Sequence, residues 1–106
     1  MKREIENRQP HKSLKRCFES FLCNATSSDI TKGFNEYWIL SGAILGLWWA
    51  DMITCTQWEL LNDLQYHIMK KRAYKGGIPA VEKEIDFILE DGGTHAMQKR
   101  LKEKRP

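Results

Sequence analysis

The sequence predicts an all-α fold, a small bundle of four helices around a long central helix rich in Trp and Gly, with a fifth if the C-terminal segment is also helical. Apolar residues recur with the helical period of about 3.6 residues in 14–22, 58–68 and 81–89. No segment alternates apolar and polar residues as a half-buried strand does. Gly, Pro and helix-capping residues separate the periodic segments, so the connections between helices are short.

The first helix is predicted over roughly 11–23, where one stripe of apolar residues comprises Leu14, Cys17, Phe18, Phe21 and Leu22. The second is predicted over about 29–51. Ser28 or Asp29 can accept hydrogen bonds from the free amides at its start.

A third helix is expected at about 55–73, after a turn at 52–56. Thr54 with Gln57, and Thr56 with Glu59, both match the capping box, in which side chain and backbone bond reciprocally. So short a turn predicts that the second and third helices pack as an antiparallel hairpin.

Gly76 and Gly77 end the third helix, and Ile78-Pro79 begins a fourth, which Asp91-Gly92-Gly93 stops. The domain plan is a polar N-terminal tail (1–10), a helical domain (11–93) and a basic tail or short helix (94–106). A last segment this short and polar is marginal alone, so it is expected either to dock on a partner or to fray.

The segment Glu36–Ile53 is the predicted centre, because it holds three of the four tryptophans and no Lys or Arg. In a helix Gly42, Gly46 and Ala50 fall close to one line, which another helix can approach closely. Trp38 and Trp49 lie beside that line. A helix that is apolar all round is buried on more than one side.

Two kinds of neighbour could fill this small-residue line. One is a second copy or a partner protein, which would make Trp38, Gly42, Gly46, Trp49 and Ala50 an interface and the protein a homodimer or a dimer of dimers. The other is a helix of the same chain.

The net charge of +3 is unevenly distributed. Residues 1–35 carry +3, residues 36–69 carry −4 with no basic group, and residues 70–106 carry +4. The basic ends suit nucleic acid or an acidic protein, and they also suit solvated flanks around an apolar middle. The basic contact residues would be Lys99, Arg100, Lys102, Lys104 and Arg105. Phe87 falls off its apolar stripe and is a candidate exposed anchor.

Catalytic and metal sites are not expected, and no cofactor is predicted. Cys17 and Cys23 do not have the spacing of paired zinc ligands, and buried free thiols are the better interpretation. Cys55 and His67 would lie about 18 Å apart on one helix, too far for a nucleophile and its base.

Localisation is expected to be cytoplasmic, because the first residues have no apolar core of the signal-peptide type and three cysteines form no disulfide framework. The apolar run from Tyr37 to Ala50 is fourteen residues long. A membrane span needs about 20.

An apolar helix followed by Ala50-Asp51-Met52-Ile53-Thr54 and then Gln57-Trp58-Glu59-Leu60-Leu61 resembles a helical hairpin in small accessory proteins of enteric phages and plasmids. Antirepressors and inhibitors of host defence are among those proteins. The resemblance covers about 36–70 and carries over no functional residue. It implies binding to another protein, such as a host or phage regulator or a defence component.

The predicted function is therefore a non-enzymatic regulator or inhibitor that oligomerises and sequesters or blocks a partner protein. The alternative is a small DNA-binding transcriptional regulator that uses its basic ends. A second alternative is an amphipathic protein associated with a membrane surface.

Overall fold

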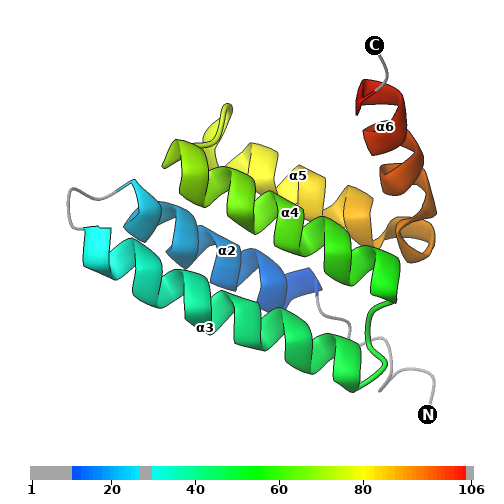
Figure 1. Ribbon diagram of the computed structural model, residues 1–106, viewed down its shortest axis with the longest axis horizontal. Coiled ribbons are helices and arrows are strands. Elements are labelled where there is room, and N and C mark those ends of the chain that lie inside the picture. Colours follow the sequence, from blue (N-terminus) through cyan, green and yellow to red (C-terminus); the bar gives the residue numbers. More distant parts are fainter. Residues whose placement is uncertain (1–10, 27–29, 105–106) are drawn as a thin grey trace.

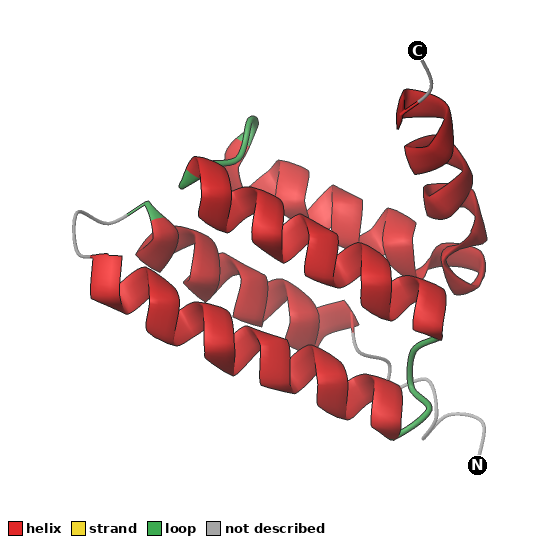
Figure 2. Ribbon diagram, viewed as in Figure 1, coloured by secondary structure: helices red, strands yellow, loops and turns green. Residues whose placement is uncertain are grey.

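The computed structural model describes residues 11–26 and 30–104, and every regular element in these ranges is a helix (Figures 1 and 2). The elements are α2 (His11–Ala25), α3 (Ile30–Trp49), α4 (Cys55–Lys71), α5 (Gly77–Leu89), the 3-10 turn η1 (Glu90–Gly93) and α6 (Thr94–Lys104). The all-α prediction is confirmed. The expected cap at Ser28 or Asp29 and the tail 1–10 lie outside the described residues.

Helices α2 to α5 form an up-and-down bundle in which each runs antiparallel to the next, and α6 leaves the end of α5 at an angle (Figure 1). The short turn between α3 and α4 produces the hairpin that the sequence predicts. Helix α2 packs against α3, α5 and α4, and α4 also packs against α5 and α6.

The core is built from the predicted apolar stripes. Its largest fully buried apolar side chains come from α2 to α5 and are Leu14, Phe18, Phe21, Leu40, Ile44, Leu61, Ile68, Val81, Ile85 and Ile88. The apolar stripes of the four helices face one shared interior, because that arrangement removes them from water. Burial of these side chains supplies the main driving force for the fold.

The prediction that the Trp- and Gly-rich helix is central is wrong. Helix α3 contacts α2 and α4 but neither α5 nor α6, so it lies along one edge of the bundle (Figure 1). Leu40 and Ile44 face the core, whereas the opposite side has no neighbour among the described residues. A helix that is apolar all round is expected to be buried on more than one side, but the surface that covers it need not belong to its own chain.

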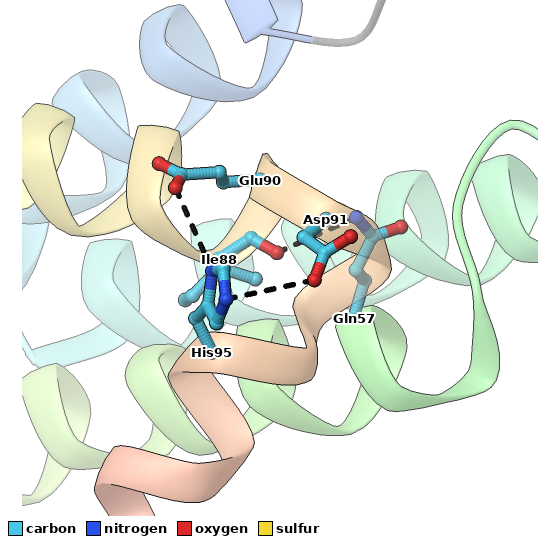
Figure 3. Close-up of polar contacts among 5 residues, drawn as sticks. All are labelled: Gln57, Ile88, Glu90, Asp91 and His95. Carbon is cyan, nitrogen blue, oxygen red and sulfur yellow. Dashed lines mark hydrogen bonds and ion pairs between the residues drawn. The ribbon is translucent and has the colours of Figure 1, made fainter.

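Helix α4 begins with a capping box at Thr54, one of the two candidates. The Thr54 hydroxyl accepts a hydrogen bond from the backbone N–H of Gln57 at 3.1 Å, and Gln57 Oε1 accepts one from the backbone N–H of Thr54 at 2.8 Å. The same hydroxyl donates to the Gly92 carbonyl at 2.7 Å, and Gln57 Nε2 donates to the Ile88 carbonyl at 3.4 Å (Figure 3). The cap of α4 therefore also fixes the end of α5. Thr56 lies inside α4 and is not the cap.

The chain changes direction between α5 and α6 through three consecutive residues with positive φ, Asp91, Gly92 and Gly93. Gly93 has a φ of 89°, and a Cβ there would lie 3.0 Å from Gln57 Cγ. Both the conformation and the close approach require glycine.

Helix α6 docks on its own chain. Ala96 is buried, and Arg100 Nη1 lies 2.5 Å from Asp63 Oδ2 on α4. Met97 is half-buried against the core, while Leu101 stays 55% exposed. None of the described helices combines the length and the apolar character needed to cross a membrane.

Candidate protein-interaction surface on helix α3

The rotation of α3 about its axis is fixed by a buried amide on α4. Gln65 is fully buried, and its Nε2 donates to the Tyr37 carbonyl at 2.8 Å and to Ser41 Oγ at 2.6 Å. A buried amide that lost these bonds would be left unsatisfied, which costs about 1–3 kcal/mol. Gln65 therefore holds the Tyr37–Ser41 turn of α3 toward the core and leaves the opposite side facing outward.

The side of α3 that faces away from α2 and α4 is exposed and largely apolar. We call it the outer face, and it comprises the polar Asn35 and the apolar residues Phe34, Trp38, Ile39, Gly42, Ala43, Gly46, Trp49 and Ala50. Trp49 is 74% exposed, Trp38 69%, Ile39 64% and Phe34 50%. Isolated apolar side chains are common on protein surfaces, but four large ones along one helix form a contiguous patch.

The predicted small-residue line runs along the middle of the outer face. A Cβ built on Gly42 or Gly46 would meet no atom of the described chain within 4 Å. Both glycines and Ala50 are exposed. The alternative in which the line seats a helix of the same chain is therefore wrong for the described residues.

No charged side chain interrupts the outer face. Glu36 is the one ionisable carboxylate between Phe34 and Ala50, and it points toward α2. Its Oε1 accepts from Asn24 Nδ2 at 3.3 Å and from Ser20 Oγ at 3.4 Å. Depletion of charge distinguishes the centre of a protein interface from the rest of a protein surface.

The two adjacent tryptophans at the end of α3 have different surroundings. The Trp48 ring stacks on Trp58 of α4, with centroids 4.7 Å apart and planes at 25°. The Trp49 ring points away from the bundle and is exposed. The Trp38 ring meets the Tyr37 ring edge-on, with the ring centroids 5.5 Å apart, so Tyr37 supports one side of the Trp38 ring.

The five predicted basic contact residues do not form a free basic patch. Arg100 pairs with Asp63, and Lys99 Nζ lies 5.5 Å from the centre of the Phe87 ring. Lys102 is exposed, Lys104 ends α6, and Arg105 lies outside the described residues. Two of the five are therefore engaged within the chain. The prediction that Phe87 is an exposed anchor is wrong, because α6 folds beside it and leaves it half-buried.

The three cysteines are free. Cys17 and Cys23 were predicted to be buried, but Cys17 is half-buried in the α2 stripe and Cys23 is exposed. Cys55 is also exposed. Among the described residues no three His, Cys, Asp or Glu side chains gather in a way that could hold a metal ion.

Two of the histidines, His67 and His95, are exposed. His67 contacts Tyr74 edge-on at 5.9 Å. His95 lies 3.7 Å from both Glu90 and Asp91, at the surface (Figure 3). Burial, and then the nearby Glu84 carboxylate, raise the pKa of Tyr74.

Sequence reasoning missed three residues that define this surface. Phe34 and Ile39 follow from the helical spacing, because Phe34 lies four residues before Trp38 and Ile39 seven before Gly46. Gln65 lies four residues after Leu61 and three before Ile68, so it occupies a core position of the α4 stripe. A polar residue at such a position signals a buried hydrogen bond.

In comparisons with models of protein families, with curated proteins and with solved structures, no match to this chain was found.

Proposed function

We propose that this protein is a non-enzymatic regulator that acts by binding proteins, and that the outer face of α3 is its contact surface. The observation that carries the proposal is the exposure of Trp38 and Trp49 on a face without charge. Tryptophan is among the residues most enriched at the energetic centres of protein interfaces.

The size of the outer face supports a protein partner. Aromatic side chains bury about 150–250 Å² each, so the exposed fractions of the four large side chains amount to roughly 500 Å². A standard interface buries about 800 Å² per partner. The outer face therefore suits the apolar centre of such an interface, with neighbouring polar residues at its rim.

Oligomerisation is part of the proposal. A helix face with two exposed glycines admits a second helix at close range, and closed two-fold pairing is the commonest arrangement of identical chains. The protein would then sequester or block its partner as an oligomer.

The class of partner is proposed from the resemblance of the α3–α4 hairpin to accessory proteins of enteric phages and plasmids. A regulator or a defence component of the host or of a phage is the partner we propose. The proposed role is that of an antirepressor or an anti-defence inhibitor.

The experiment is a quantitative pull-down with the full chain from host lysate, followed by mass spectrometry. The wild type is compared with the double variant Trp38→Ala/Trp49→Ala and with Tyr66→Ala. Tyr66 is a matched control, because it is 58% exposed but lies on α4 away from the outer face. The proposal expects specific proteins that the double variant loses and Tyr66→Ala retains.

Salt separates this function from DNA binding. An apolar interface keeps its affinity as salt rises, whereas phosphate contacts lose about 10³–10⁵ in affinity between 50 and 200 mM salt. Binding to DNA with that steep dependence, unaffected by the double tryptophan variant, would refute the proposal.

A further inference from the structure

We propose that the outer face of α3 binds a second copy of itself in antiparallel orientation, with Trp38 of each copy packed against Trp49 of the other. The inference deepens the proposed function and rests on it, because it names the first occupant of that surface. It depends on the positions of the exposed residues along α3, and on the charges at the two ends of the helix.

The outer face is nearly symmetric about its own centre. Ile44 lies midway between Gly42 and Gly46, and Trp38 and Trp49 lie six residues before it and five after it. A two-fold axis across the helix at this level therefore places Gly42 of one copy opposite Gly46 of the other. The same axis brings Trp38 to the level of Trp49 in the second copy.

The exposed residues of α3 lie on two different sides of the glycine line. Eleven residues are close to three helical turns, so Trp38 and Trp49 share one edge of the line. Ile39 and Ala43 lie along the other edge. An axis across the helix brings like edges together, so the two tryptophan edges meet and form the Trp38–Trp49 contact twice.

The charges at the two ends of α3 favour antiparallel pairing. Lys32 is exposed near the start of α3, and Asp51 is exposed just after its end. Antiparallel pairing brings Lys32 of each copy toward Asp51 and the helix C-terminus of the other, where a cation is favoured. Parallel pairing would instead place the two Lys32 side chains together and the two Asp51 side chains together.

The area is sufficient for a dimer. Two copies together remove roughly 1,000 Å² of large side-chain surface, which reaches the lower bound of a specific interface. The glycines add close contact between the two backbones. Within the described part of the chain neither α5 nor α6 contacts α3, so these helices leave this edge open to a second copy.

The first test is a double-mutant cycle measured by sedimentation equilibrium. Trp38→Ala and Trp49→Ala should each weaken the dimer roughly tenfold or more, because each removes the same two ring contacts. The double variant should be weaker than either single variant by only a small further factor. Tyr66→Ala should leave the dissociation constant unchanged.

The second test measures orientation directly. A spin label is attached at the native Cys23, which is exposed near the end of α2, in a chain whose Cys17 and Cys55 are replaced by Ser. Cys23 lies on α2 and not on the outer face, so the label leaves the proposed contact unchanged. Because α2 and α3 are antiparallel neighbours, Cys23 lies near the level of the start of α3, so antiparallel pairing places the two labels at opposite ends of the dimer and parallel pairing places them at the same end.

The outcomes separate this inference from the proposed function. A long label distance with coupled tryptophan effects supports the antiparallel dimer. A dimer with labels side by side, or with additive tryptophan effects, overturns the arrangement but leaves a self-associating protein. A wild type that stays monomeric overturns the arrangement and also the oligomeric part of the proposed function.

Discussion

Gln65 Nε2 donates a hydrogen bond to Ser41 Oγ at 2.6 Å across the α3–α4 interface, and the Gln65 side chain is fully buried. No donor among the described residues reaches its Oε1. The amide therefore specifies how α3 is rotated, and it leaves one buried acceptor unsatisfied.

Gln65→Ala should lower the free energy of unfolding by about 2–4 kcal/mol, because it leaves a cavity and removes both bonds to α3. Gln65→Leu should cost less, since leucine fills the space and removes the unsatisfied oxygen. Urea unfolding followed by circular dichroism measures both. Equal stability of Gln65→Ala and wild type would show that the amide does not hold α3.

Gly93→Ala should destabilise the fold by about 1–3 kcal/mol, because φ is 89° and the added Cβ meets Gln57 Cγ at 3.0 Å. Gly42→Ala is the matched control. Its site is helical and open, so alanine should stabilise the monomer by about 0.5–1 kcal/mol. Thermal melts at submicromolar concentration compare the two, and a Gly93→Ala melt at the wild-type temperature would contradict the turn geometry.

Thr54→Ala should cost about 1–2 kcal/mol, because it removes the cap of α4 and the bond to the Gly92 carbonyl. Thr56→Ala tests the other match to the capping box and should cost less, since Thr56 lies inside α4. The measurement is the midpoint of urea unfolding. A larger loss for Thr56→Ala would reverse the assignment of the cap.

Tyr74 should make stability fall in alkaline solution. Burial and Glu84 raise its pKa above the ordinary value of 10.0, so the folded state holds the phenol proton more tightly than the unfolded chain does. The loss of stability is therefore absent below about pH 10 and grows as the pH rises toward the folded-state pKa. Tyr74→Phe should lose this part of the pH dependence. Identical slopes for the two proteins above pH 10 would rule out the linkage.

Helical periodicity predicted the elements and the core well, because residues such as Phe18, Leu61 and Ile85 repeat at the spacing of one helix face. It could not predict which side of α3 would be left uncovered. Trp48 and Trp49 are adjacent and chemically identical, yet one stacks on Trp58 and the other is exposed. That difference depends on the rotation of α3, which Gln65 fixes from a distant part of the chain.

The sequence also did not predict where α6 packs. The sequence marks the turn at 91–93 but not the direction in which it sends α6. The docking also depends on the pairing of Arg100 with Asp63, a long-range contact with no periodic signal. Phe87 was predicted to be an exposed anchor and is half-buried because α6 folds beside it.

The central claim is that the outer face of α3 binds a second copy of the protein. The most direct test is light scattering of wild type and Gly46→Leu at matched micromolar concentrations. The expected result is a wild-type mass of at least twice 12.4 kDa and a Gly46→Leu mass of 12.4 kDa. At submicromolar concentration, where both proteins are monomers, the variant should lose no thermal stability, because a Cβ at this site meets no atom within 4 Å. A wild type that scatters as a 12.4 kDa monomer would contradict the claim.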